Sequence, residues 1–280
     1  MELALVTVVL LLLAVVAEHV LCQPLPARYH VEERGTRFVF CDEEGREILF
    51  RGINLATLGG GGSDVPINTK LYSNGSCPAN NNDWYQPPIC EQDIVDVKRA
   101  GFDSVRLLVH WSQVEPRPGK YDKVYLARLN QIIDWAGESG LDVVVDFHQD
   151  NYANNSHACC ADDGAPSWAW LVNETRLSAG EKLEISLMKK IIPQLDWDGA
   201  EVAFHAFWTN VPVPETKIGL QTHYIQAFAA VVNATMYKDA VIGYEIMNEP
   251  LPGLDINLFD FADNFLYPFC ALFVYIVLHH

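Results

Sequence analysis

Four segments of the chain are rich in apolar residues and end in polar ones. They are residues 48–56 (ILFRGINLA), 102–111 (FDSVRLLVHW), 141–150 (LDVVVDFHQD) and 240–250 (AVIGYEIMNEP). Near-continuous apolar runs of this length are typical of strands covered on both faces of a parallel sheet. The pattern therefore predicts four buried strands with polar side chains at their C-terminal ends.

Helical patterns lie between the predicted strands. Residues 91–101 and 125–140 have apolar side chains at helical spacing and end on glycines, and residues 223–236 form a third such segment. Alternating strands and helices fit either a doubly wound sheet or a (β/α)8 TIM barrel. No G-x-G-x-x-G follows a predicted strand, which counts against the dinucleotide-binding form of the doubly wound sheet. We therefore expect an α/β fold of the barrel type.

The N-terminus has the composition of a targeting sequence. Residues 3–17 are almost wholly apolar, too few for a comfortable membrane span, and residues 20–22 (VLC) permit cleavage before Gln23. We expect a signal peptide over residues 1–22 and one domain over residues 23–280. The protein is then secreted to the extracellular space or delivered to the lysosome.

The cysteines and glycosylation motifs agree with the secretory pathway. Six of the seven cysteines follow the predicted leader, and an even number in a secreted chain predicts disulfides without fixing the pairing. We expect Cys77 to pair with Cys90, because these two residues bracket a loop rich in Asn and Pro. The N-x-[ST] motifs that predict N-glycosylation are at Asn74, Asn154, Asn173 and Asn233.

The charge balance limits the classes of partner. The chain carries 36 acidic and 19 basic residues, a formal net charge of −17, so it should repel the phosphates of nucleic acid. This balance suits neutral or lipid-linked substrates. The glycine run at residues 59–62 lacks the G-K-[ST] of a phosphate-binding loop, and no cofactor is expected.

The end of the third predicted strand carries groups that can bind a polar substrate. Asp146, His148 and Asp150 alternate along the chain, so their side chains should project to the same side. A solvated strand end is the simpler interpretation, but three polar groups after an apolar run also fit hydrogen bonds to sugar hydroxyls. A metal site from His148 and Asp150, or from residues 157–160 (HACC), lacks the usual ligand spacing. We expect no metal.

Arg106 lies inside the second apolar strand. A charge there is costly unless it is paired, so we expect a carboxylate nearby. Arg106 is either one half of a structural ion pair or the group that keeps a catalytic carboxylate ionised. Glu245, deep in the fourth strand, is a candidate partner.

The segment Asn248-Glu249-Pro250 is the sharpest chemical signal in the chain. Glu249 can act as a general acid where its surroundings raise its pKa, and Asn248 can hold the 2-hydroxyl of a sugar. Both side chains can serve one site only where the strand ends or kinks. Pro250 favours extended geometry at Glu249.

These motifs together resemble those of glycoside hydrolase family five. RGIN, FDSVRLLVHW, DVVVDFHQD and IGYEIMNEP occur in the family's order. The segments RLLVHWSQVEPRPGKYD (106–122), HQD (148–150) and PSWA (166–169) resemble its endoglycoceramidase branch more narrowly. The resemblance runs from about residue 35 to about residue 268.

The resemblance implies a retaining hydrolase with a TIM-barrel domain that cuts the bond between an oligosaccharide and ceramide. The implied partner is a glycolipid or oligosaccharide, with peripheral contact to membranes or lipid micelles. The implied roles are Glu249 as acid/base, Asn248 as the sugar contact beside it, Arg106 as support for the nucleophile, His148 and Asp150 as glucose contacts, Trp168 as a pocket wall, and Lys70 as a basic sugar contact.

The chain also departs from the family pattern. In the family, the motif of Glu249 ends the fourth of eight strands, and the nucleophile ends the seventh. The chain stops at His280, so we expect a barrel truncated after about the fourth or fifth strand, without its nucleophile and inactive in this form. The uncharged residues 265–278 are then an interrupted fifth helix and strand. The alternatives are a non-catalytic glycan- or glycolipid-binding fragment and a family-five β-glucanase.

Overall fold

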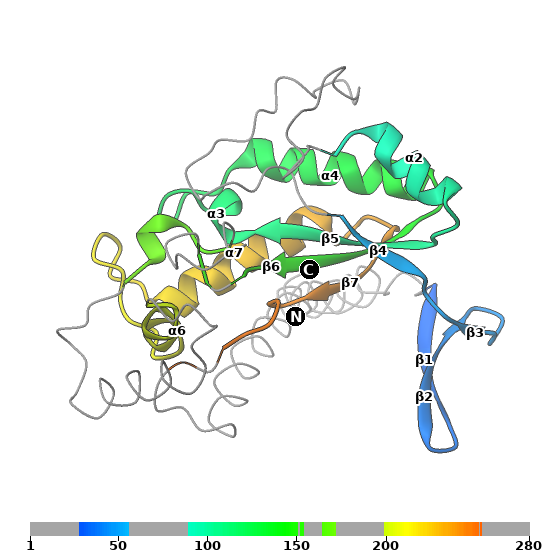
Figure 1. Cartoon of the computed structure of the whole chain (residues 1–280), viewed down its shortest axis with the longest axis horizontal. Helices are drawn as coiled ribbons and strands as arrows, with labels where there is room; N and C mark the ends of the chain where they lie inside the picture. Colours follow the sequence, from blue (N-terminus) through cyan, green and yellow to red (C-terminus); the bar gives the residue numbers. More distant parts are fainter. Residues whose placement is uncertain are drawn as a thin grey trace, which may run out of the picture. The chain divides into compact units, whose positions relative to one another are not determined.

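The computed structural model describes residues 28–55, 89–150, 152–153, 164–171, 199–251 and 253. The chain divides into two compact units, whose described parts begin at Arg28 and at Arg51. Figure 1 labels the elements of both units. The predicted leader and the apolar residues 265–278 lie outside the described residues.

The second unit is built on a four-stranded parallel sheet. Its strands lie in the order β4-β5-β6-β7, each beside its neighbour in sequence (Figure 1). A doubly wound sheet reverses its strand order at one point, whereas a barrel adds each new strand beside the last. The sequential order therefore favours the barrel. The strands are β4 (Gly52–Leu55), β5 (Ser104–His110), β6 (Asp142–His148) and β7 (Val241–Glu245).

Helices occupy the connections between these strands. Helix α2 packs against α4 and α4 packs against α7, so the helices follow the order of the strands. The helices predicted at residues 91–101, 125–140 and 223–236 are confirmed as α2, α4 and α7. The helices are α2 (Glu91–Arg99), α3 (Trp111–Val114), α4 (Lys123–Glu138), the short 3-10 helix η2 (Ser167–Ala169), α6 (Ala200–Trp208) and α7 (Leu220–Thr235).

The two faces of the parallel sheet differ in chemistry. The odd-numbered residues of β5 and β6 are apolar and almost fully buried. Phe147, at the end of this row, packs against Tyr224 and Phe228 of α7, with ring centroids 4.8 Å and 5.7 Å away. Because side chains alternate along a strand, the polar even-numbered residues project to the face away from the helices.

The first unit is a small antiparallel sheet. Strands β1 (Tyr29–Arg34) and β2 (Arg37–Asp42) form a hairpin, and β3 (Glu47–Ile48) pairs with β2. The hairpin turn has Gly35 at φ +68°, the positive φ that a tight two-residue turn requires. No long continuous apolar run marks these strands in the sequence.

The single strand predicted over residues 48–56 is wrong. Residue 48 ends β3 of the small sheet, whereas residues 52–55 form β4 of the parallel sheet. Leu49 between them is 82% exposed. An apolar stretch shared by two sheets has the same composition as one buried strand, so the pattern could not separate them.

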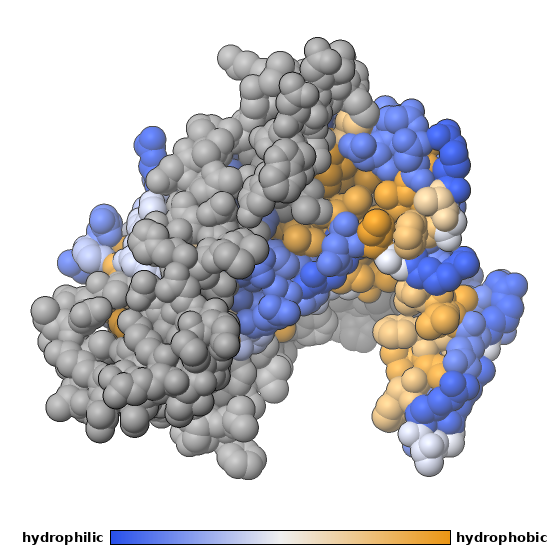
Figure 2. Space-filling model, viewed as in Figure 1, coloured by the Kyte–Doolittle hydropathy of each residue, from blue (hydrophilic) through white to orange (hydrophobic). Residues whose placement is uncertain are grey.

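The hairpin has one apolar face. Val31 and Phe40 face each other across β1 and β2, and both side chains are exposed, as is that of Phe38. Figure 2 shows apolar side chains along one side of this sheet and polar ones along the other. This alternation is the signal of a two-faced strand, distinct from the continuous apolar runs of the parallel sheet.

The cysteines in the described residues follow the predicted pattern only in part. Cys90 is disulfide-bonded, and its pairing with Cys77 stays a prediction. Cys41 is free and buried, and the predicted full set of disulfides is wrong there. Cys41 faces Arg34, whose Nη2 donates to its Sγ at 3.2 Å. Within the described residues no helix is long and apolar enough to cross a membrane.

Helix α4 begins at an aspartate cap. Oδ1 of Asp122 accepts hydrogen bonds from the backbone N–H groups of Val124 (2.8 Å) and Tyr125 (3.0 Å). Asp122→Ala should lower the free energy of unfolding, measured by urea titration, by about 1 kcal/mol. Asp122→Asn keeps the cap and is the matched control. Equal losses in the two variants would contradict a capping role.

Candidate active site

The candidate site lies on the polar face of the parallel sheet. Asp146 of β6 pairs in register with Glu245 of β7 and with Leu108 of β5, and Arg106 lies two residues before Leu108. Paired residues in a parallel sheet share a face, as do residues two apart. Strands β5, β6 and β7 therefore each present a charged side chain to the same side.

A register shift in β7 directs Glu245 to this face. Between Val143 and Val144 of β6, the partner in β7 advances from residue 241 to residue 243, so Ile242 is an extra residue. An extra residue reverses the side that all later side chains face. Without it, Glu245 would point to the helices, where the hydroxyl of Tyr244 now contacts Thr235 of α7 at 2.9 Å.

Arg106 is the centre of the cluster. Its Nε donates to Oε2 of Glu245 at 2.6 Å and its Nη2 to Oε1 at 2.7 Å. The same Nη2 lies 2.9 Å from Oδ2 of Asp146 and donates to Oδ1 of Asn248 at 3.0 Å. The hydrogen bonds to Glu245 raise the pKa of Arg106 above its usual value. The predicted carboxylate beside Arg106 is confirmed, and so is Glu245 as an ion-pair partner.

His148 lies between two carboxylates. Its Nδ1 is 2.6 Å from Oδ2 of Asp146, and its Nε2 is 3.4 Å from Oδ2 of Asp150. The prediction that these three side chains share one side is confirmed. Burial raises the pKa of Asp146, although His148 and Arg106 act in the opposite direction. The hydrogen bond with His148 lowers the pKa of Asp150, so Asp150 is the ionised acceptor of the pair.

Asn248 connects the end of β7 to the end of β6. Its Nδ2 donates to the backbone oxygen of Gln149 at 3.1 Å and to Oδ1 of Asp150 at 3.4 Å. Its Oδ1 accepts from Arg106, and the side chain is buried. Strand β7 ends at Glu245, earlier than the strand predicted over residues 240–250. Asn248 and Glu249 therefore follow the strand, which is the condition under which both side chains can serve one site.

Glu249 stands beside this cluster with an exposed side chain. Its φ is +37°, in the left-handed region that non-glycine residues rarely adopt. The extended geometry predicted from Pro250 is therefore wrong. Nε2 of Gln149 donates to the backbone oxygens of both Asn248 (2.6 Å) and Glu249 (3.2 Å), and these tertiary hydrogen bonds override the local preference.

Trp168 is half-buried on η2, and a buried acidic residue holds it. Its Nε1 donates to the backbone oxygen of Glu115 at 3.1 Å, and its ring lies 5.1 Å from that of His223. The carboxylate of Glu115 is fully buried and accepts from Nε1 of Trp111 (2.8 Å) and lies 2.7 Å from Nδ1 of His223. This network fixes the indole of Trp168, while its predicted role as a pocket wall stays a prediction.

The remaining predicted residues divide by position. Asn233 is exposed on α7, where a glycan can be accommodated. The other predicted residues, Lys70, Asn74, Asn154 and Asn173, lie outside the described residues.

Two further residues secure the strand ends. The hydroxyl of Tyr224 donates to the backbone oxygens of Phe147 (3.3 Å) and Ile246 (2.8 Å), which joins the ends of β6 and β7. The ring of His110 meets that of His148 edge to face, 5.9 Å between centroids. In the sequence, His110 is distinguished only as a polar residue at the end of an apolar strand. Nothing in the sequence distinguishes Tyr224 except its place on a predicted helix.

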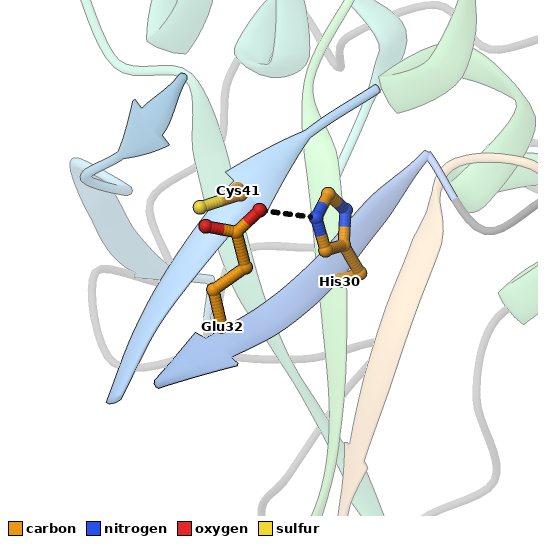
Figure 3. Close-up of side chains that lie close together, drawn as sticks. All are labelled: His30, Glu32 and Cys41. Atoms are coloured by element: carbon orange, nitrogen blue, oxygen red, sulfur yellow. Dashed lines mark hydrogen bonds and ion pairs between the residues drawn. The ribbon is translucent and has the colours of Figure 1, made fainter. Parts of the chain in front are cut away.

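A second group of potential metal ligands occurs on the small sheet. His30, Glu32 and Cys41 lie together on one face (Figure 3), with ligand atoms within 4.8 Å of one another. Nε2 of His30 is 3.0 Å from Oε1 of Glu32, and Arg34 donates to the other oxygen of Glu32 at 2.9 Å and 3.0 Å. Because Arg34 already neutralises this carboxylate, a divalent cation would have to displace it. We therefore interpret the group as an ion-pair network.

A barrel-type sheet with acidic, amide and histidine side chains at its C-terminal strand ends is the arrangement of a TIM-barrel enzyme. Residues 61–264 match Cellulase (glycosyl hydrolase family 5). The chain belongs to this family of glycoside hydrolases.

The similar proteins include a glucosylceramidase and an endoglycoceramidase. The chain is 27% identical over 260 residues to a glucosylceramidase from Rhizopus delemar and 28% identical over 219 residues to endoglycoceramidase I from Rhodococcus hoagii, covering 81% and 78% of this chain. It spans only 36% of each relative's length.

Solved structures agree with these relatives. An endogalactoceramidase has a TM-score of 0.60 at 28% identity, and endo-glycoceramidase II from Rhodococcus sp. in complex with ganglioside GM3 has 0.56 at 27%. The matches cover 86% and 83% of this chain but 47% and 46% of those chains. The family and these structures imply the (β/α)8 barrel, of which the described residues contain four strands.

His110 should make the stability of the protein depend on pH. Burial, with repulsion from His148, lowers the pKa of His110 to about 3. Below the ordinary pKa of histidine, His110 therefore binds a proton in the unfolded chain but not in the folded chain. The free energy of unfolding consequently falls as the pH falls. When the pH is lowered from about 7 to about 5, the free energy of unfolding should decrease in the wild type and in His110→Gln. The decrease should be about 1–2 kcal/mol smaller in His110→Gln. Equal losses, measured by urea titration at both pH values, would contradict this.

Proposed function

We propose that the chain supplies the acid/base half of the active site of a retaining glycosidase that hydrolyses the bond between oligosaccharide and ceramide in glycosphingolipids. The observation that carries the proposal is the convergence of Arg106, His148, Asp150 and Asn248 beside Glu249 at the strand ends of a family 5 chain. Relatives named glucosylceramidase and endoglycoceramidase support the glycolipid substrate.

Glu249 is the proposed acid/base. Its exposed carboxyl group can reach a bound substrate, give its proton to the glycosidic oxygen as the bond breaks, and later take a proton from the attacking water. Asn248 lies next to it, with its amide fixed by Arg106. The long 3.4 Å contact from its Nδ2 to Asp150 is one that a sugar hydroxyl can replace.

His148 and Asp150 are the proposed contacts to the glucose unit. Asp150 is ionised and partly exposed, and His148 is held in place by Asp146. An ionised carboxylate accepts hydrogen bonds from hydroxyl groups, and an imidazole fixed on one side presents its other nitrogen. We propose that Trp168 and Lys70 complete the sugar site.

The nucleophile is proposed to lie outside these 280 residues. Retaining hydrolysis needs two carboxyl groups about 5–5.5 Å apart. Both carboxylate oxygens of Glu245 accept hydrogen bonds from Arg106, and Asp146 is fully buried, so we do not propose either as the nucleophile. The chain spans less than half the length of its relatives, and the second carboxylate is expected in the part that it does not match.

The proposed cellular setting follows from the predicted leader, disulfides and glycosylation motifs. We propose that the protein is secreted or lysosomal, carries N-glycans at Asn233 and the other predicted sites, and touches lipid micelles or membranes only peripherally while it acts. Glycolipid headgroups are accessible to such a hydrolase at the surfaces of micelles and membranes.

The test is hydrolysis of a fluorescent glycosphingolipid by the full-length protein that contains these residues. Glu249→Gln should lower the release of intact oligosaccharide by about 10²–10⁴-fold, because the leaving oxygen loses its proton donor. Glu215→Gln, at an exposed position, is the matched control and should keep the wild-type rate. Release at the wild-type rate by Glu249→Gln would refute the acid/base role.

The alternatives are separated in the same assay. Cello-oligosaccharides offered in place of the glycolipid test a β-glucanase, and cleavage of these alone would replace the glycolipid assignment. Tight binding of a glucosylceramide headgroup by the 280-residue chain, with no hydrolysis by the full-length protein, would indicate a glycolipid-binding protein.

A further inference from the structure

We infer that Gln149 is a positioning residue for Glu249: its side-chain amide holds the backbone turn from which the proposed acid/base projects. The inference rests on the proposed function of Glu249 and adds a residue to which no role was assigned. Gln149 lies between the two proposed sugar contacts, His148 and Asp150, but its side chain is buried and points to the backbone instead.

The side-chain amide nitrogen of Gln149 donates hydrogen bonds to two consecutive backbone carbonyl groups. Nε2 donates to the backbone oxygen of Asn248 at 2.6 Å and to that of Glu249 at 3.2 Å. In an extended strand, successive carbonyls point in opposite directions. Both can approach one donor only where the backbone between them turns, and that turn is the φ of +37° at Glu249.

The backbone turn at Glu249 is strained, so contacts from another segment have to stabilise it. A non-glycine residue in the left-handed region is uncommon, and the proline at 250 favours extended geometry for the residue before it. Glu249 therefore lacks a local reason to keep its conformation. The amide of Gln149 supplies one from the neighbouring strand end.

Gln149 is itself fixed on three sides. Its Oε1 accepts from the backbone N–H of Tyr152 at 2.6 Å, and its backbone oxygen accepts from Asn248 at 3.1 Å. Gly164 packs so closely that a Cβ there would lie 2.7 Å from the Cβ of Gln149. An amide whose oxygen and nitrogen both have backbone partners has one orientation, so it can set the position of the turn.

The consequence concerns proton transfer more than substrate binding. A general acid must lie within hydrogen-bond reach of the leaving oxygen, and a displacement of about 1 Å costs about 10²-fold in rate. The side chain of Glu249 is exposed, so the backbone turn determines where it starts. Loss of the Gln149 amide should move the carboxyl group and leave the sugar contacts of His148 and Asp150 in place.

The first arm of the experiment measures the turn itself in the full chain. Gln149→Glu keeps the shape but places a carboxylate oxygen against two carbonyl oxygens, and Gln149→Asn keeps the amide but is too short to reach them. Both should speed hydrogen exchange of the backbone amides at residues 247–249 and 251 by about tenfold or more, since the strained turn opens more often. Gln226→Glu, exposed on α7, is the matched control, and thermal melting checks the fold.

The second arm separates acid catalysis from general damage, with the full-length protein. A dinitrophenyl glycoside of the same sugar leaves without needing a proton, whereas the glycolipid needs one. Gln149→Glu and Gln149→Asn should lower kcat/KM for the glycolipid by about 10²-fold. For the dinitrophenyl glycoside the loss should stay below about threefold, because only the proton-dependent step has lost its donor.

The outcomes are distinct. Unchanged hydrogen exchange in both variants would refute the hold on the turn. Equal losses on the two substrates would refute the positioning role, since a merely structural defect harms both. A wild-type protein that cleaves neither substrate would overturn the proposed function, and with it the catalytic part of this inference, independently of the variants.

Discussion

One cation on the polar face of the sheet organises the candidate site. Arg106 projects from β5, binds Glu245 of β7 through two hydrogen bonds, contacts Asp146 of β6 and holds the amide of Asn248. A charge in this position is tolerated only because it is paired. The same contacts bring residues of three strands and the following turn into one cluster, so the proposed sugar contacts and the proposed acid/base depend on Arg106.

Two departures from regular strand geometry complete the arrangement. The extra residue Ile242 turns Glu245 to the polar face, where it can meet Arg106. The left-handed backbone at Glu249, held by Gln149, then raises the proposed acid/base beside Asn248. A regular strand would have separated these groups onto opposite faces. The segment that carries the proposed chemistry thus has both a register shift and a strained backbone, as is common at functional sites.

The sequence predicted the parts of this structure that depend on local patterns. Apolar runs located β5, β6 and β7, glycine stops located α2 and α4, and a lone Arg106 in an apolar strand required a carboxylate. The register shift at Ile242 and the backbone of Glu249 depend on contacts between distant segments, and no local pattern encodes them. The strands of the small hairpin alternate between apolar and polar residues, so no long continuous apolar run marks them. The number of cysteines does not reveal which of them face one another, so it could not predict that Cys41 is free.

The most direct test of this account is the coupling energy between Arg106 and Glu245. It is measured by urea unfolding of the wild type, Arg106→Met, Glu245→Met and the double variant. If Arg106 organises the site, each single variant leaves a charge without its partner, and the double variant should recover about 1–3 kcal/mol relative to the sum of the two. A coupling below about 0.5 kcal/mol, the value of an ordinary surface ion pair, would contradict the central place given to Arg106.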